Sequence, residues 1–325
     1  MLQNPKSIAI LNPIALNNMT NSQDLITARI LADSISPSGQ RMTTMEIEYP
    51  RFILAELNTH RMLSKNSASS RAIPVKAMHQ HIRDNTAGPV YWGVNQPGMK
   101  AKTCLDAEDT VEALMIWEQA RDSALDFASQ LADLNLHKQI TNRVTEPWMT
   151  MKTVISGTEW ANFFWLRDHP DAQPEIALLA RRKREAYEAS TPQLLHPGEW
   201  HLPYVKSTRL SSGELIYLDS EDLPITLQQA QVISASCCAQ VSYRKSDDSF
   251  EKAQKVFQML IESEPAHASP VEHQATPMDV ESMCRFEPET WQPGVTHVSA
   301  NSDLWSGNLR GWIQFRKLIP NEARW

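Results

Sequence analysis

The sequence lacks the signatures of a secreted, disulfide-bonded or membrane protein. Its four cysteines, Cys104, Cys237, Cys238 and Cys284, show no C-x-x-C spacing, and adjacent cysteines seldom form a structural disulfide. We expect reduced, buried thiols. No apolar run approaches the ~18 residues that a membrane-spanning helix needs, and the N-terminus has no signal-peptide pattern. A cytoplasmic protein that does not enter a membrane is therefore expected.

An excess of basic residues and the common nucleotide-binding motifs are also missing. The net charge of -7 argues against stable nucleic-acid binding, although it leaves room for a local basic pocket that holds one phosphate. The absence of G-x-G-x-x-G, G-x-x-x-x-G-K-[ST] and G-x-S-x-G leaves a Rossmann turn, a P-loop and a hydrolase elbow without support. There is no repeat or low-complexity block. The 325 residues suffice for one large domain or two modest ones.

Helical spacing of apolar residues dominates the chain, with few strand patterns, which predicts an α+β fold. Helices are expected over 24–35, 109–136, 157–170, 173–190, 225–243 and 249–263. Asp109 or Thr110 should cap the second of these, and Pro147 should end any helix that precedes it. Residues 43–57 read as two strands hinged at Pro50, the second apolar and buried. Residues 76–106 and 196–224 read as irregular connections.

A polar stretch, THRMLSKNSASSR (59–71), follows the apolar residues 50–57. Its serines, together with Arg61 and Arg71, are suited to holding a phosphate through charge-assisted hydrogen bonds. A solvated loop is the alternative, and for the stretch taken alone it is the better interpretation.

Three further clusters contain groups capable of chemistry. HKQITNRVTEPW (137–148) contains Asn142 and Arg143, and alone it reads as a solvated helix end. NFFWLRDHPDAQPEI (162–176) places Arg167 among aromatic residues, where an ion pair with Asp168, Asp171 or Glu175 is the simplest interpretation. HASPVEH (267–273) has two histidines and a carboxylate, but Pro270 and the lack of a third ligand cluster argue against zinc.

Taken together, the four clusters resemble the flavin-dependent thymidylate synthases. That family's signature is Arg-His-Arg, then seven residues, then Ser. Here THR is followed by the seven residues MLSKNSA and by Ser69, with Arg71 two residues later. Its Ala-Arg…Pro segment is similar to Asn142, Arg143 and Pro147. Its Asn-Phe-Leu-x-Leu-Arg helix and Ala-Gln-x-Glu-Ile are similar to NFFWLR (162–167) and AQPEI (172–176). CAQVSY (238–243) and HASPVEH resemble two further segments of the family.

The last two segments precede the Arg-His-Arg motif in the family and follow it here, which is the order of a circular permutation. Such a rearrangement is tolerated when the original termini lie close together at the surface. We therefore expect an N-terminal extension (1–40) and a single catalytic domain (41–325), with the family's N-terminal block at about 230–273. The resemblance covers about 43–71, 138–176 and 230–273.

The resemblance implies a flavin-dependent thymidylate synthase-like fold, with a mixed or antiparallel sheet and long helices, assembled as a homotetramer. It also implies transfer of a one-carbon unit from 5,10-methylenetetrahydrofolate to C5 of a pyrimidine deoxynucleoside monophosphate (dUMP to dTMP), with FAD as hydride relay and NADPH as reductant. Arg167 and Ser69 would be catalytic, with Arg167 stabilising negative charge as C5 becomes nucleophilic. The nucleotide would contact Glu56, Ser69, Ser70, Arg71, Arg143 and Arg167. The cofactor-binding positions would be His60, Arg61, Asn66, Ser67, Asn162, Ser242, His267, Ser269 and Glu272. No metal is implied, and no cysteine nucleophile is required.

Three positions depart from the family pattern. Thr59 replaces an arginine that faces the flavin, Ser67 stands where the family has Glu, and Glu56 stands where it has a nucleotide-contacting Gln. A carboxylate only accepts hydrogen bonds, which suits the N4 amine of cytosine better than O4 of uracil. Four questions stay open. Glu56 either faces the base or pairs with an arginine, the base is uracil or cytosine, and the product is methyl or hydroxymethyl. The chain is either such an enzyme or a non-catalytic nucleotide-binding module without flavin.

Overall fold

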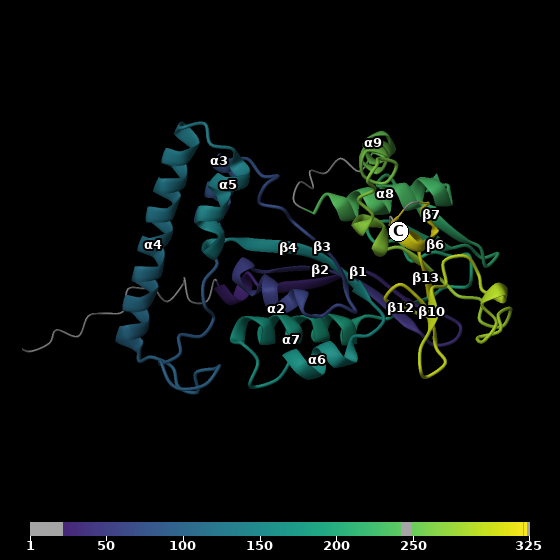
Figure 1. Cartoon of the computed structure of the whole chain (residues 1–325), viewed down its shortest axis with the longest axis horizontal. Coiled ribbons are helices and arrows are strands. Elements are labelled where there is room, and N and C mark those ends of the chain that lie inside the picture. Colours follow the sequence, from purple (N-terminus) through teal and green to yellow (C-terminus); the bar gives the residue numbers. More distant parts are fainter. Residues whose placement is uncertain (1–21, 242–248, 321, 324–325) are drawn as a thin grey trace, which may run out of the picture.

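A mixed five-stranded sheet organises the computed structural model, which describes residues 22–241, 249–320 and 322–323 (Figure 1). The strand order is β3–β4–β2–β1–β5, and every pair is antiparallel except β1 with β5. The strands are β1 (Thr27–Ile35), β2 (Arg41–Pro50), β3 (Ser64–Ser67), β4 (Thr150–Gly157) and β5 (Gln193–Leu194). The expected α+β class, with a mixed sheet and long helices, is confirmed.

The first strand replaces a helix that the sequence predicts over 24–35. β1 pairs with β2 from Thr27 to Ile35, and the register shifts between Ile30 and Ala32. This irregularity interrupts the apolar alternation of a strand, so the spacing of apolar residues imitates a helix. The helix prediction is wrong because pairing with β2 outweighs the local pattern. Part of the expected N-terminal extension thus lies in the main sheet.

The apolar run after Pro50 is helical and does not form the second strand that the sequence predicts. It consists of a 3-10 turn, η1 (Arg51–Ile53), and the helix α2 (Leu54–Asn58). Ile53 and Leu57, four residues apart, are fully buried, so one helical face enters the core. The strand prediction is right about burial and wrong about conformation, because Leu, Ala and Glu favour a helix.

Helices lie on both faces of this sheet. Ile176 packs with Ile47 of β2 on one face, while Cys238 packs with Val154 of β4 on the other. The helices concerned are α6 (Ala161–Arg167), α7 (Pro174–Ala189) and α8 (Leu227–Ala239). Figure 1 shows α6 and α7 on the opposite side of the strands from α8. All three expected helices form, with shorter bounds. Cys237 and Cys238 are buried as expected, whereas Cys104 is exposed.

A long helix, α4, stands at one end of the sheet beside α3 and α5 (Figure 1). The elements here are α3 (Val75–Asp84), α4 (Ala107–Asp133), α5 (Lys138–Thr141) and the 3-10 turn η2 (Asn142–Trp148). The expected helix is confirmed, but its N-cap is Asp106, whose side chain accepts from the Asp109 amide. Pro147 lies inside η2, which ends one residue later.

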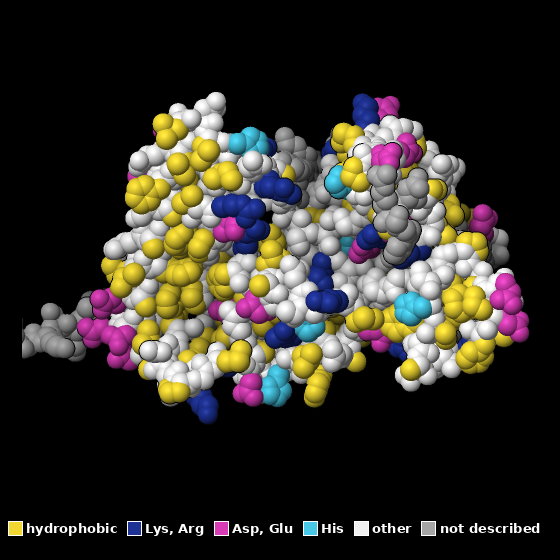
Figure 2. All heavy atoms as spheres, in the orientation of Figure 1, with side chains coloured by type: hydrophobic (Ala, Val, Ile, Leu, Met, Phe, Trp, Pro, Cys, Tyr) yellow, Lys and Arg dark blue, Asp and Glu magenta, His cyan; other side chains and the backbone are white. Residues whose placement is uncertain are grey.

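One side of α4 exposes apolar residues to solvent. Ile116, Phe127 and Leu134 are 58%, 59% and 79% exposed. Because their separations of eleven and seven residues are close to whole numbers of helical turns, they lie along one face. Figure 2 shows apolar side chains gathered along this part of the surface. Covering this face would remove these exposed apolar side chains from water.

The C-terminal region is built from short elements. Residues 196–224, expected as a connection, contain most of a small antiparallel sheet made of β6 (Lys206–Arg209), β7 (Leu215–Leu218) and β8 (Pro224–Ile225). The helix expected over 249–263 is α9 (Phe250–Leu260). The elements that follow are η3 (Ser269–Glu272), β9 (Ala275–Pro277), η4 (Pro288–Thr290), β10 (His297–Val298), β11 (Leu304–Ser306), β12 (Leu309–Arg310), β13 (Trp312–Gln314) and η5 (Phe315–Leu318). Within the described ranges, no helix is long and apolar enough to cross a membrane.

Candidate functional site

Four parts of the chain that carry family-like motifs contact the polar segment 59–71. The partners in these four contacts lie up to 203 residues apart in sequence. The pairs are Arg167 with His60, Asn142 with Ser70, Cys238 with Asn66, and Ser269 with Asn66. The motifs therefore meet around this one segment, which begins after α2 and runs through β3.

Arg167, at the end of α6, lies against the start of this segment. Its Nε donates to His60 Nε2 at 2.8 Å, and its Nη2 donates to Thr59 Oγ1 at 3.1 Å. His60 Nε2 is thus an acceptor. Burial, then the positive charges of Arg167, Lys183 and Lys65, lower the pKa of His60 to about 4. The imidazole is therefore neutral at pH 7 and holds the guanidinium without neutralising it.

The expected ion pair between Arg167 and a nearby carboxylate is absent among the described residues. Asp168 is engaged by Arg184 at 2.6 Å and Arg181 at 3.6 Å. Glu175 is buried, and its Oε1 accepts from the Val90 amide at 2.8 Å. The ion-pair interpretation is wrong because the chain turns after α6 and directs Asp168 toward α7. Arg167 keeps its charge available at the surface of segment 59–71.

Two lysines lie behind His60, and burial lowers the pKa of each. Lys65 donates to the carbonyl oxygens of His60 and Leu63, and burial lowers its pKa to about 8. Lys183 of α7 is fully buried, and its Nζ lies 3.5 Å from the centre of the Phe163 ring with no hydrogen-bond partner in the described structure. Burial and then the charge of Lys65 lower the pKa of Lys183 well below its usual range. Groups with strongly perturbed pKa values of this kind cluster at functional sites.

We expect Lys183→Met to stabilise the protein at pH 7 by on the order of 1–4 kcal/mol, the range found when buried ion pairs are replaced by packed apolar groups. At a pH between the pKa of the folded protein and that of the unfolded chain, Lys183 is protonated only in the unfolded chain. Wild-type stability should therefore rise with pH from the folded pKa to the unfolded one, and this rise should disappear in the variant. Urea denaturation between pH 6 and 10 measures it.

Lys76→Met is the matched control, because Lys76 is exposed on α3. It should leave both the stability and its pH dependence unchanged. Equal pH profiles for Lys183→Met and wild type would show that Lys183 finds a stabilising partner.

Glu56 of α2 contributes a buried acceptor near the same site. Its Oε2 is buried without a hydrogen-bond partner, and it forms no ion pair with any arginine in the part of the chain described. The alternative in which Glu56 pairs with an arginine thus finds no support. Burial and then the charge of Glu56 raise the pKa of Glu175. A buried carboxylate oxygen of this kind calls for a donor, which a ligand can supply.

A second group of contacts fixes the end of segment 59–71. Asn142 is fully buried, so the solvated helix end expected for it is wrong. Its Nδ2 donates to the carbonyl oxygens of Ser70 and Ile73 at 2.8 and 2.9 Å, and Lys138 Nζ donates to the Ala72 carbonyl at 2.9 Å. Arg71 is exposed on the turn held in this way.

The remaining expected nucleotide contacts lie close to this turn in sequence or space. Ser70 is buried and Ser69 is half-buried. Arg143, next to Asn142, is exposed and lies 3.5 Å from a carboxylate oxygen of Glu146. Arg143 thus has a carboxylate neighbour, whereas Arg71 forms no ion pair with another described residue.

Some of the expected cofactor-binding residues form hydrogen bonds or ion pairs with other described residues, and others are exposed. Asn66 and Ser269 form a hydrogen bond of 3.3 Å, while Ser67 Oγ lies 2.8 Å from Thr153 Oγ1, so Ser67 is engaged within the sheet. Glu272 pairs with Arg316. Arg61, Asn162 and His267 are exposed. Ser242 lies outside the described residues.

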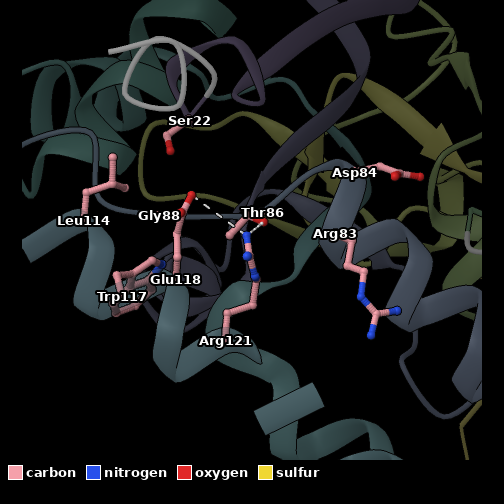
Figure 3. Close-up of a pocket in the computed structure, with 9 residues that line it drawn as sticks. All are labelled: Ser22, Arg83, Asp84, Thr86, Gly88, Leu114, Trp117, Glu118 and Arg121. Atoms are coloured by element: carbon pink, nitrogen blue, oxygen red, sulfur yellow. Dashed lines mark hydrogen bonds and ion pairs between the residues drawn. The ribbon is translucent and has the colours of Figure 1, made fainter. Parts of the chain in front are cut away.

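A separate cavity lies away from segment 59–71. It encloses about 180 Å³ between α3, α4 and the loop after α3, where Arg121 donates to Thr86 (Figure 3). None of the expected site residues lines it. Metal chemistry has no candidate site in the described residues, because they contain no group of three or more ligating side chains.

Lys183 is a site-region residue that the sequence reading misses. It belongs to the charged run RRKR, which suggests a solvated face. However, Ile176, Leu179 and Ala180 are fully buried in the same helix, and Lys183 continues their three- to four-residue spacing. That periodicity is the signal that would have revealed it.

Comparison with known proteins identifies the family of the chain. The family model described as thymidylate synthase complementing protein matches residues 6–193, more than half of the 325-residue chain. The chain belongs to this family. The match includes 6–40 and 76–106, which the motif resemblance leaves out. The thymidylate synthase complementing protein family supports methylation of a pyrimidine nucleotide at C5 as the reaction.

Two solved structures are similar to the chain, both of the UMP/dUMP methylase PolB from Streptomyces cacaoi. One is bound with 5-Br UMP and is 17% identical, and the other is bound with 5-Br dUMP and is 16% identical. Each comparison covers 50% of this chain and 88% or 89% of the other, with a TM-score of 0.42. None of the curated proteins compared with the chain matches it. The domain division and the circular permutation stay predictions.

Proposed function

We propose that the chain transfers a one-carbon unit from 5,10-methylenetetrahydrofolate to C5 of a pyrimidine deoxynucleoside monophosphate, with FAD and NADPH as cofactors. The observation that carries the proposal is the setting of Arg167. Its guanidinium contacts His60 and Thr59, and it has no carboxylate partner among the described residues. A cation thus lies at the segment expected to separate the flavin from the nucleotide. The first substrate to consider is dUMP, giving dTMP.

The chemistry of the side chains fits both anionic ligands. Arg61 near the start of segment 59–71 and Arg71 at its end are exposed, and neither forms an ion pair with another described residue. One suits the diphosphate of FAD and the other the phosphate of the nucleotide. The carboxylate Glu56 and the hydroxyls of Ser69 and Ser70 add acceptors and donors for a base and a phosphate. Bound flavin would supply the hydride that completes the methyl group.

The roles of this chain's residues follow from their charges. Arg167 faces the pyrimidine and stabilises the negative charge that makes C5 nucleophilic, which a guanidinium in a half-buried setting does better than one in water. Neutral His60 orients it. Ser69 and Arg71 hold the phosphate, while Asn142 keeps their turn in place. A cysteine nucleophile is not needed.

The decisive experiment is to purify the protein, record its flavin absorbance, and assay dUMP and dCMP with methylenetetrahydrofolate and NADPH. A yellow preparation that methylates either nucleotide supports the proposal. A colourless protein that binds dUMP but cannot be reconstituted with FAD would instead favour the non-catalytic binding module. Mass spectrometry of the product separates a methyl group from a hydroxymethyl group.

The buried, unpartnered Oε2 of Glu56 favours dCMP as a second candidate substrate. Cytosine carries an N4 amine that donates, whereas uracil offers an acceptor at the same position. The product would be 5-methyl- or 5-hydroxymethyl-dCMP. Turnover of dUMP alone in the assay above would exclude this candidate.

We also propose that the chain forms a homo-oligomer through the exposed face of α4. Replacing both Ile116 and Phe127 with serine removes apolar area from this face. Each lost large side chain makes the free energy of association less favourable by about 2 kcal/mol. The variant should therefore dissociate toward monomers in light scattering after gel filtration. Phe286→Ser is the control, since Phe286 is 75% exposed elsewhere. If the double variant keeps the wild-type mass, this face is not the interface.

A further inference from the structure

The C-terminal segment 296–317 lies outside both the family match and the motif resemblance, yet it contacts the candidate site. It contains β10 to β13 and most of η5. The turn between β11 and β12 has two residues, Gly307 and Asn308, because Ser306 pairs with Leu309. Gly307 has a φ of +59°, which such a tight turn requires. The turn directs Asn308 toward segment 59–71.

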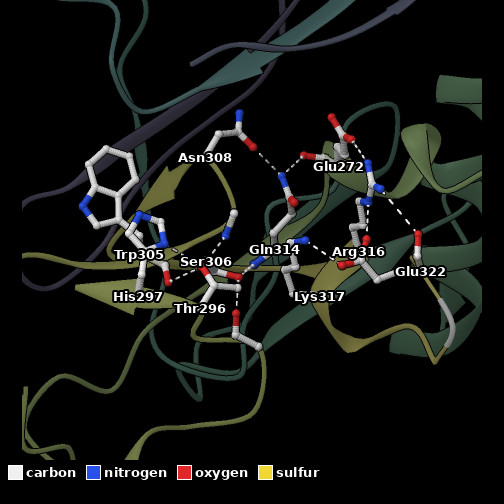
Figure 4. Close-up of polar contacts among 12 residues, drawn as sticks. Glu272, Thr296, His297, Trp305, Ser306, Asn308, Gln314, Arg316, Lys317 and Glu322 are labelled. Carbon is white, nitrogen blue, oxygen red and sulfur yellow. Dashed lines mark hydrogen bonds and ion pairs between the residues drawn. The ribbon is translucent and has the colours of Figure 1, made fainter. Parts of the chain in front are cut away.

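Asn308 is hydrogen-bonded on both sides of its amide. Its Nδ2 lies 3.0 Å from the Met62 carbonyl oxygen and 3.0 Å from Ser64 Oγ. Its Oδ1 accepts from Gln314 Nε2 at 3.0 Å (Figure 4). Gln314 is 1% exposed and is held by β13, so the orientation of the amide is set by the core. Asn308 thus fixes the backbone directly after His60 and Arg61.

The same segment contacts two other parts of the site. Gln314 Nε2 also donates to the Glu272 carbonyl at 3.2 Å, and Arg316 pairs with the Glu272 side chain. Arg310 Nε donates to Glu159 at 2.7 Å, just before α6. Three of the regions expected to contact flavin, around His60 to Asn66, Asn162, and Ser269 to Glu272, therefore share one support. The turn around Arg71 is held separately, by Asn142 and Lys138.

We propose that Asn308 is a positioning residue for flavin binding, acting through the backbone of Met62 to keep Arg61 in place. The inference rests on the proposed function, because it takes FAD to be the ligand of segment 60–66. It assigns a role to a part of the chain that the family motifs do not reach. Since the nucleotide phosphate turn has its own supports, loss of Asn308 should weaken flavin binding selectively.

The test compares Asn308→Ala and Asn308→Asp with wild type by titrating FAD into flavin-free protein and following flavin fluorescence. Both variants lack the Nδ2 donor, so both should bind FAD about tenfold more weakly, which corresponds to ~1.4 kcal/mol. Asn308→Asp keeps the shape of the side chain and its acceptor oxygen. If Asn308 acted only through packing, this variant would bind FAD as tightly as wild type does. Asn301→Ala, exposed in the same segment, is the matched control. Calorimetric titration of dUMP should change less than twofold in every variant.

A double-mutant cycle with Arg61→Ala asks whether Asn308 acts through Arg61. The tenfold effect of Asn308→Ala should shrink to about twofold in the Arg61→Ala background. FAD affinity within twofold of wild type in Asn308→Ala, or an equal loss of dUMP affinity, would overturn the inference while leaving the proposed function standing. Failure of the wild-type chain to bind FAD at all would overturn both.

Discussion

Replacement of Arg167 with alanine is expected to lower kcat/KM for the pyrimidine nucleotide by about 100- to 1,000-fold, the usual cost of losing one charge-stabilising donor. The guanidinium is held by the neutral ring of His60 and by Thr59, so its charge remains available to the ligand. Lysine cannot reproduce two divergent N–H donors, and Arg167→Lys should recover little of the loss. Steady-state kinetics on the preferred nucleotide, with flavin absorbance from the same preparation, measure the effect.

The same substitution should raise the pKa of His60 above its value of about 4. Burial, the largest cause of the lowered pKa, persists in the variant, but the positive charge of Arg167, the second cause, is removed. Protonation of His60 then becomes easier, and an NMR titration between pH 3 and 7 should show the midpoint move upward. Arg181→Ala is the control, because Arg181 is also close to α6 but pairs with Asp168. A kcat/KM within fivefold of wild type for Arg167→Ala would contradict the role.

The sequence predicts those elements whose side-chain periodicity agrees with their packing. α4 and α7 are long and amphipathic, and both lie where the apolar spacing places them. β1 fails because its irregular register with β2 disturbs the alternation, and residues 51–58 fail because an apolar run carries no information on period. The two errors differ in cause: pairing with β2 decided the conformation of β1, whereas the helix propensity of Leu, Ala and Glu decided that of α2.

The sequence identified residues of the candidate site but not the contacts that these residues make. The motif pattern pointed to Arg167 and Asn142, and both contact segment 59–71. It could not show that Asp168 turns toward α7 or that Lys183 is buried, since both depend on how α6 packs on α7. The contribution of Asn308 was also hidden, because 244 residues separate it from Ser64. Long-range hydrogen bonds of this kind leave no periodic trace in a single sequence.

Substitution of Glu56 with glutamine is expected to lower the preference for dCMP over dUMP, taken as the ratio of kcat/KM values, by about 10- to 100-fold. The carboxylate can only accept hydrogen bonds, and its Oε2 is buried without a partner among the described residues. An amide adds a donor that O4 of uracil can accept, as at the family's glutamine. Removing the charge of Glu56 should also allow the pKa of Glu175 to fall, because that charge contributes to raising it.

Competition assays with both nucleotides, before and after the substitution, measure the ratio directly. Glu48→Gln is a suitable control, since Glu48 is a partly buried carboxylate on β2 that is hydrogen-bonded by Thr150 and so has a partner. It should leave the ratio unchanged. An unchanged ratio in Glu56→Gln would mean that Glu56 does not face the base, and the distinction between uracil and cytosine would then have to come from another side chain of the nucleotide pocket. A shift toward dUMP would instead identify this one position as the point at which the substrate of this chain departs from that of its family.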